Sequence, residues 1–252
     1  MILSLQNSIG ENSNDALYES AYRTLRRAIL TGLFEPGEKI TIRNLANTLG
    51  LSTMPAREAL RRLVAEKGLE LPHNRRSVRV PILSIARMNE LWRVRLALEG
   101  LAAEVAGAKS SSADIEEIAL IQMRLAAARK SQDFTAIMLN NFDFHHALYQ
   151  LANMPYLLSL IESLWLNVGP LLSKLYGRGR GTQLRDDAHH AEVIKALRNA
   201  DPLGVRRAVE RDIEQALPHL LEIVSSLSLK NEIDEPVIPL VKKSGKTQKR
   251  IV

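Results

Sequence analysis

The fold is decided by the stretch Gly50–Pro81, which reads GLSTMPAREALRRLVAEKGLELPHNRRSVRVP. Ser52 is placed to act as the N-cap of a helix that tolerates Pro55 in its first turn and that ends near Lys67, before Gly68. In such a helix the leucine and valine side chains share one face, and the arginines fall largely on the other. The stretch therefore predicts an amphipathic helix with a basic face.

The neighbouring segments place this helix in a small domain. Two helical patterns precede it: Tyr18–Thr31, which stops at Gly32, and Thr41–Leu49, which stops before the quoted stretch. After it, the segments LEL (69–71) and SVRVP (77–81) flank the turn PHNRR and have the character of two short strands. Three helices and a basic hairpin make a winged helix-turn-helix, a fold that binds duplex DNA.

Positive charge is concentrated in the same part of the chain. The formal net charge is +6 at pH 7, which admits nucleic acid or an anionic membrane surface as a partner. Between Arg43 and Arg79 the basic residues clearly outnumber the acidic ones, which are Glu58, Glu66 and Glu70. The excess of positive charge therefore lies on the predicted DNA-binding helix and hairpin.

Composition also bounds the class of protein. The sequence contains no cysteine, which excludes disulfides, zinc fingers and thiol catalysis. The segment MILSLQNSIGENSND has no positive charge ahead of an apolar run, so we do not expect a secretory signal. The longest apolar stretch, YLLSLIESLWLNVGPLLSKLY (156–176), is interrupted by polar residues and by Gly-Pro, which favours a buried helix over a membrane span. We expect a cytoplasmic protein without a membrane partner.

From Ser84 onward every segment has helical periodicity. The expected helices cover residues 84–108, 114–130, 133–152, 155–176, 183–200 and 202–229, separated by breakers such as KSSSAD, ANMP, GRGRG and NADP. The fold class expected is mainly α, with the winged helix-turn-helix followed by an all-α helical bundle. The expected boundaries are a flexible N-terminus at 1–14, a DNA-binding domain at 15–82, a ligand-binding and dimerisation domain at 83–229 and a basic flexible tail at 230–252.

Several motifs carry a resemblance to a known family. The pattern SxxPxREAL (52–60), preceded by PG (36–37) and LA (45–46), resembles the DNA-binding domain of GntR-family transcriptional regulators. The segments RVRLALEG (93–100), FHHALYQLANMPYL (144–157) and HAEVIKALRNAD (190–201) resemble the FCD effector domain of the FadR-type subgroup. The resemblance implies a homodimeric, ligand-responsive transcriptional regulator, more often a repressor than an activator, that binds a palindromic operator and is not an enzyme.

The DNA contacts are expected from three segments. They are the recognition helix, which begins after Ser52, the wing, which is the basic hairpin at 69–81, and the helix at 41–49. N-terminal residues of such a helix face base edges, flanking arginines meet phosphates, and wing arginines suit a narrow minor groove. The residues expected at DNA are Arg43, Ser52, Thr53, Arg57, Arg61, Arg75 and Arg76. Thr53 stands where the family often has arginine, and Arg75-Arg76 where its wing tip is often Arg-Gly, so base preference can differ from that of relatives. A solvated helix face is the alternative for these arginines.

The histidines give the second signal. One member of each doublet is expected to face inward, because His145 shares a helical face with Asn141 and Leu148, and His190 aligns with Ile194. In many relatives the helical domain holds a divalent metal through an Asp or Asn, a His four residues later and two further His. By this resemblance the ligands are Asn141, His145, His190 and Asp212, the last replacing a histidine. Such a set suits Zn, Ni, Mn or Fe, and a polar cavity without metal is the alternative.

Arg95 is the candidate for effector binding. By the same resemblance it matches an arginine that faces the cavity in relatives, and it suits bidentate capture of a small organic acid or sugar acid. An internal Arg95–Glu99 pair is the alternative. Two other functions stay open: a metal-dependent hydrolase or lyase, which the lack of HExxH, phosphate-loop and nucleophile-elbow motifs disfavours, and a non-specific architectural DNA-binding protein.

Overall fold

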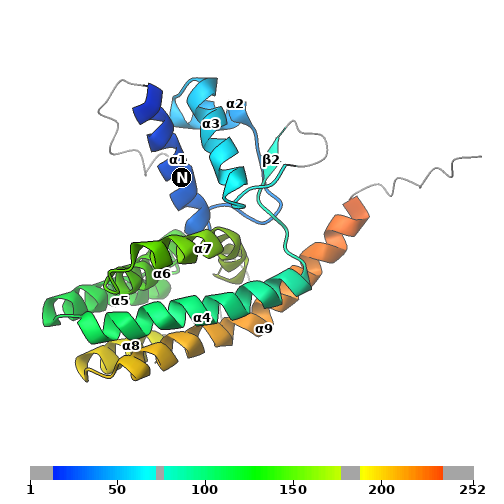
Figure 1. Cartoon of the computed structure of the whole chain (residues 1–252). Helices are drawn as coiled ribbons and strands as arrows, with labels where there is room; N and C mark the ends of the chain where they lie inside the picture. Colours follow the sequence, from blue (N-terminus) through cyan, green and yellow to red (C-terminus); the bar gives the residue numbers. More distant parts are fainter. Residues whose placement is uncertain (1–13, 72–76, 177–187, 235–252) are drawn as a thin grey trace, which may run out of the picture.

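The computed structural model describes residues 14–71, 77–176 and 188–234 (Figure 1). We call the amino-terminal part the head; it consists of α1 (Asn14–Leu30), β1 (Lys39–Ile40), α2 (Ile42–Leu49), α3 (Thr53–Ala65) and β2 (Val78–Arg79). We call the rest the bundle; it consists of α4 (Ile85–Lys109), α5 (Ser112–Ser131), α6 (Phe134–Gln150), α7 (Pro155–Tyr176), α8 (Ala188–Arg198) and α9 (Pro202–Asp234). The mainly α fold class is confirmed.

The core of the head forms where α1 and α2 pack against α3. Leu25 and Ile29 of α1 meet Leu60 and Leu63 of α3 in a fully or nearly fully buried cluster. The hydroxyl of Thr41 accepts a hydrogen bond from the backbone N–H of Asn44 and so caps the start of α2. Burial of one face of α3 leaves its opposite, basic face directed away from the head.

The small sheet differs from the predicted hairpin. β1 pairs with β2 in antiparallel register, with Lys39 opposite Arg79 and Ile40 opposite Val78. The predicted strand 69–71 contributes a single bridge, in which Glu70 and Arg79 exchange backbone hydrogen bonds of 2.8 and 2.9 Å. Strand β1 was missed by the sequence analysis because two residues are too few to show an alternating pattern.

The bundle helices agree closely with the expected ones. α4 and α9 run side by side along its length, α8 packs on α9, and α5 packs on α6 (Figure 1). Helix α9 continues to Asp234, into the segment expected to be a flexible tail. Helix α3 ends at Ala65, a little earlier than expected, because Lys67 adopts a left-handed conformation with a φ of 61°. Residues 183–187, expected in the fifth bundle helix, lie outside the described residues.

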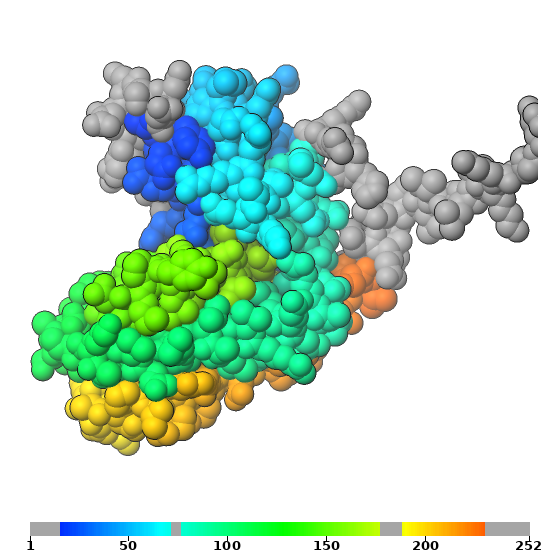
Figure 2. Space-filling model, viewed as in Figure 1, coloured from blue at the N-terminus to red at the C-terminus, as the bar shows by residue number. Residues whose placement is uncertain are grey.

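Helix α7 lies where the head meets the bundle (Figures 1 and 2). It packs against α1 of the head and against α4, α6 and α9 of the bundle. By length and composition α7 could cross a membrane, but Ile161, Trp165, Leu166 and Leu172 are buried inside the protein, as in a core helix. The apolar core runs without interruption from the head into the bundle.

Candidate functional site

The exposed face of α3 gathers most of the residues predicted to bind DNA. Its buried face consists of Pro55, Ala56, Ala59, Leu60 and Leu63. Ser52 occupies the N-cap position, although its side chain makes no capping hydrogen bond. The predicted contact residues Arg43, Ser52, Thr53, Arg57 and Arg61 are all exposed, whereas Arg75 and Arg76 lie outside the described residues. The described part of the predicted set is therefore available to a large partner.

The three arginines of α3 differ in what they contact. Arg61 pairs with Glu58 at 3.2 Å, but its side chain is 74% exposed, so this pair is weak and readily exchanged. Arg62 instead lies over the Tyr22 ring of α1 at 3.7 Å and donates one hydrogen bond to Glu66 at 3.2 Å and one to Glu19 of α1 at 3.1 Å. Arg57 and Arg61 thus point outward, while Arg62 helps to hold α3 on α1.

Met54 is a candidate contact that the sequence analysis missed. Its side chain is 64% exposed in the first turn of α3, on the same face as Arg57 and Arg61. An exposed large apolar side chain among polar neighbours can contact a thymine methyl group in the major groove. The signal in the sequence was its spacing of seven residues from Arg61.

Three of the four predicted metal ligands converge in the bundle. His145 comes from α6, His190 from α8 and Asp212 from α9, and their ligand atoms all lie within 4.8 Å of one another. The two Nε2 atoms are 3.2 Å apart; Asp212 Oδ2 lies 3.2 Å from His145 Nε2, and Asp212 Oδ1 lies 3.6 Å from His190 Nε2. Asn141 is buried on α6, one turn before His145. The three segments are far apart in the sequence, so the fold itself assembles the cluster.

Hydrogen bonds at the other ring nitrogens favour one tautomer of each histidine. His190 Nδ1 lies 2.8 Å from the side-chain amide oxygen Oε1 of Gln122, which can only accept, so this contact favours the proton on Nδ1. The Tyr149 hydroxyl donates to Glu99 Oε2 at 2.8 Å and is therefore free to accept from His145 Nδ1 at 3.3 Å. In these tautomers the Nε2 atoms of both rings present lone pairs to each other and to the Asp212 carboxylate. Three acceptors meeting at one point require a cation or a proton between them.

Burial and charge set the protonation states in this cluster. Burial lowers the pKa of His190 to about 3, against the opposing effect of the Asp212 carboxylate, so this ring is neutral at neutral pH. Burial alone raises the pKa of Asp212, but the nearby His190 and His145 rings outweigh it and hold this pKa below its usual value. The cluster therefore offers a neutral imidazole and a carboxylate.

The spacing of these atoms fits a small divalent cation. A tetrahedral ion with bonds of about 2.0–2.2 Å to nitrogen and oxygen separates neighbouring ligand atoms by about 3.3–3.6 Å. The separations of 3.2, 3.2 and 3.6 Å observed here are close to that range. Gln122 and Tyr149 supply the outer hydrogen bonds that orient the two rings. Asp212 reaches the point where the two imidazoles meet.

Arg95 is engaged inside the protein. Its guanidinium donates to both carboxylate oxygens of Glu99, at 2.6 and 3.4 Å, and both residues are buried. Its Cζ also lies 5.4 Å from the ring centres of Trp92 and Trp165. Of the two readings of Arg95, the structure contains the internal ion pair, and through Glu99 and Tyr149 this pair connects to His145.

A buried indole lies beside the same cluster. Trp165 of α7 is 4% exposed, and its ring centre is 5.7 Å from that of His145. Its Nε1–H has no hydrogen-bond partner among the described residues. A buried donor without a partner is costly in a native structure, and a bound ligand is one way to satisfy it. Sequence patterns gave no signal for this donor, because the rings around it come from another helix, α6.

Comparison with known proteins follows the same division into head and bundle. The family model "Bacterial regulatory proteins, gntR family" matches residues 17–80, and the model "FCD domain" matches residues 90–215. The chain is 30% identical over 199 residues to the HTH-type transcriptional regulator McbR of Escherichia coli strain K12, covering 79% of this chain and 90% of that protein. It is 26% identical over 185 residues to the gluconate operon transcriptional repressor of Bacillus licheniformis, covering 70% and 74% of the two chains.

Solved structures agree. The structure of E. coli McbR/YncC matches with a TM-score of 0.75 and 30% identity over 82% of this chain and 97% of that one. A GntR regulator from Rhodococcus sp. RHA1 shares the fold, with a TM-score of 0.66 and 21% identity over 81% and 97% of the chains. The relatives are named as transcriptional regulators, and this chain is a DNA-binding regulator rather than an enzyme. The protein belongs to the GntR family of bacterial transcriptional regulators and carries an FCD domain.

Proposed function

We propose that the protein is a cytoplasmic, homodimeric repressor that binds a palindromic operator and releases or retains it according to a small organic acid bound at a divalent metal in the bundle. Two heads in a symmetric dimer suit a palindrome, because each head meets an equivalent half-site. The domain boundaries proposed are residues 15–82 for the head and 83–229 for the bundle. The observation that carries the proposal is the convergence of three acceptor atoms in the bundle of a DNA-binding regulator.

The DNA contacts proposed rest on exposure and chemistry. Arg57 can donate two hydrogen bonds to guanine N7 and O6, and Ser52 and Thr53 sit at the helix N-terminus, where backbone amides favour a phosphate. Arg61 and Arg43 are proposed to bind phosphates or neighbouring bases, and the exposure of both side chains supports this. Arg75 and Arg76 remain proposed wing contacts on sequence grounds. An architectural DNA-binding protein would instead show little sequence preference and a steep salt dependence.

The metal proposed is Zn, Ni, Mn or Fe, held by His145, His190 and Asp212 with Asn141 as a further oxygen donor. Support comes from the ligand spacing, from the lone pairs left on both Nε2 atoms and from the low pKa of His190. When bound, such an ion supplies a Lewis-acid position that a carboxylate can occupy. The residues of this chain orient that position, because Gln122 and Tyr149 hold the rings in place.

A small organic acid fits the surroundings of this site. The unpartnered Trp165 Nε1–H can donate to a ligand oxygen, and Arg95 contributes positive charge nearby even while it is paired with Glu99. A direct role of Arg95 in ligand capture requires that it leave Glu99. One relative is named a gluconate operon repressor, which makes sugar acids a natural part of the ligand screen.

The homodimer is proposed to form along α4. Val94 and Leu101 are 40% and 39% exposed. Leu98, which lies between them in the sequence, and Val105, which follows them, are half-buried. Their spacing of four, three and four residues gives one apolar stripe along the helix, as in helices that pair with a second copy. The stripe lies on the bundle, which leaves both heads free for DNA.

Elemental analysis of untagged protein, followed by DNA binding, tests the proposal. We expect about one divalent ion per chain, and loss of that ion in His190→Gln and Asp212→Asn. Arg57→Ala should lose discrimination between a selected operator and random DNA while keeping its folded spectrum, since a bidentate guanine contact contributes about 1–3 kcal/mol. A metal-free protein, or equal affinity of wild type and Arg57→Ala for the operator, contradicts the proposal.

A further inference from the structure

One face of α7 forms the contact between the bundle and the head. Glu162, Leu166 and Gly169 are spaced by four and three residues and so lie on one side of this helix. Leu166 is fully buried and lies against Gly68, at the end of α3, where an added Cβ would come within 3.0 Å of it. The segment that directly follows the recognition helix α3 therefore packs on α7.

Gly169 brings two backbones together at this contact. A Cβ on Gly169 would lie 2.5 Å from the carbonyl oxygens of both Ile29 and Leu30, at the end of α1. On the other side, a Cβ on Gly32 would lie 2.5 Å from the carbonyl oxygen of Gly169. Only glycine permits such an approach, so the end of α1 is seated closely on α7.

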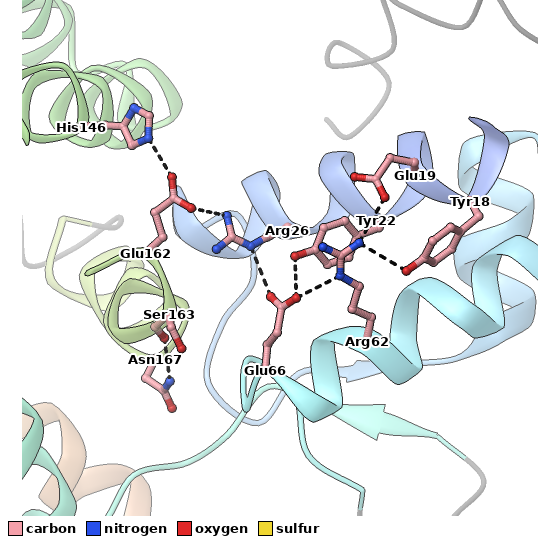
Figure 3. A network of polar contacts seen from close by, with 10 residues as sticks. All are labelled: Tyr18, Glu19, Tyr22, Arg26, Arg62, Glu66, His146, Glu162, Ser163 and Asn167. Carbon is pink, nitrogen blue, oxygen red and sulfur yellow. Dashed lines mark hydrogen bonds and ion pairs between the residues drawn. The ribbon is translucent and has the colours of Figure 1, made fainter. Parts of the chain in front are cut away.

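A series of polar contacts continues from this α1–α7 contact to the recognition helix α3 (Figure 3). Arg26 of α1 donates to Glu162 of α7 at 2.8 Å and to Glu66, the C-cap residue of α3, at 3.3 Å. Glu66 also accepts from the Tyr22 hydroxyl at 2.6 Å and from Arg62 at 3.2 Å. A single guanidinium therefore links the end of α3 to the bundle.

At its other end this series of polar contacts reaches the turn of α6 that carries His145, a proposed metal ligand. His146 donates to Glu162 Oε1 at 2.8 Å and directly follows His145 in α6. The ring centre of Phe142 lies 5.2 Å from that of His146, on which it stacks, and 5.7 Å from that of Trp165, which it meets edge to face. Trp165 is next to Leu166 in α7, so adjacent residues of one helix contact the histidine cluster and the head.

The Arg26–Glu162 pair is stronger than an ordinary surface ion pair. The two side chains are 18% and 22% exposed, so water screens their charges only partly. Burial alone raises the pKa of Glu162, but its hydrogen bond from His146 and the Arg26 charge leave this pKa below its usual value. A cleft of about 620 Å³ lined by Arg26, Glu66 and Glu162 lies at the contact, which leaves space for the pair to separate.

We propose that Arg26 and Glu162 are positioning residues that lock the head onto α7, and that occupation of the histidine cluster is transmitted to the recognition helix through Trp165, α7 and this pair. The proposal rests on the function proposed above, in which a divalent ion occupies the histidine cluster and holds the effector. It defines two arrangements: a docked head, with Arg26 between Glu66 and Glu162 as seen here, and a released head without the α7 contact. A dimer binds a palindrome well only when both heads keep the spacing of the half-sites.

The first arm of the test measures the lock without metal or DNA. The sequence has no cysteine, so Asn47→Cys on α2 and Leu120→Cys on α5, both exposed, allow spin labels on head and bundle in the otherwise unchanged protein. Wild type should give a narrow distance distribution, and Arg26→Gln or Glu162→Gln a broader one. Arg198→Gln, which removes an exposed ion pair with Glu116 inside the bundle, is the matched control and should match wild type. Unchanged distances in the Arg26 and Glu162 variants overturn the proposal.

The second arm measures transmission. Affinity for an operator fragment selected by the wild-type protein is compared in EDTA and in Zn²⁺. Wild type should change by about fivefold or more, a usual size for coupling between sites, and Arg26→Gln and Glu162→Gln by less than about twofold. The double variant should be no worse than either single one, because both remove one interaction. A Zn²⁺ effect that persists in the variants overturns transmission through this pair. The absence of a Zn²⁺ effect in wild type overturns transmission as well, and the distances of the first arm still decide the lock, whereas elemental analysis decides the proposed function.

Discussion

The burial of His190 predicts how the stability of the metal-free protein depends on pH. The pKa of this ring is about 3 in the folded protein and has a reference value of 6.5. Between these values the unfolded chain binds a proton that the folded protein does not, so the free energy of unfolding falls as the pH falls. His190 therefore leaves the free energy of unfolding unchanged well above its reference pKa of 6.5 and lowers it progressively as the pH falls below that value.

The size of the effect follows from the two pKa values. Lowering the pH from about 7 to about 5.5 should cost about 1.2 kcal/mol through His190 alone. This value changes little as long as the folded pKa stays below about 4.5. Asp212 does not contribute in this window, because its lowered pKa affects stability only below its reference value of 3.8.

Urea unfolding of protein treated with EDTA measures this effect. The loss of stability between the two pH values should be smaller in His190→Gln than in wild type by about 1.2 kcal/mol. His189→Gln, one residue earlier on the same helix, controls for the loss of a histidine at this end of α8. Equal losses in wild type and His190→Gln would refute the view that this ring is buried in its neutral form.

Three further predictions test other parts of the structure. Leu101→Glu places a charge on the exposed apolar stripe of α4 and should yield folded monomers by sedimentation at concentrations where wild type is dimeric. Gly169→Ala should lower the free energy of unfolding by about 1–3 kcal/mol in urea, because the added Cβ would lie 2.5 Å from carbonyl oxygens of α1. Arg61→Ala should weaken binding to all DNA sequences and reduce the salt slope by about 1, whereas Arg57→Ala should mainly relax specificity; identical effects would contradict the division of roles.

The helices were predictable because each carries its own local signal. Caps, glycines, prolines and a repeat of 3.6 residues located the helices from α1 to α9 within a few residues where the structure describes them. Strand β1 lacked such a signal, since two residues cannot alternate visibly, and its partner β2 lies almost forty residues later. The left-handed Lys67 that ends α3 early was likewise invisible, because lysine rarely adopts that conformation.

The site was predictable in part. The helical faces of His145 and His190 follow from their apolar neighbours at spacings of three and four, but Asp212 lies among charged residues of α9 and was found only through the family resemblance. The alternatives at Arg95 could not be separated without distances, and the structure contains its pair with Glu99. The partners Arg26 and Glu162 are 136 positions apart, so no periodic pattern could connect them.

The glycine contact between α1 and α7 has a mechanical consequence. Since main-chain atoms of both helices touch there, no side chain lies between them to act as a compressible spacer. Such a joint resists small adjustments and gives way only by separating. Evolution can therefore alter how readily this joint opens by changing the residues around it, while the angle at which it closes remains fixed by the backbone.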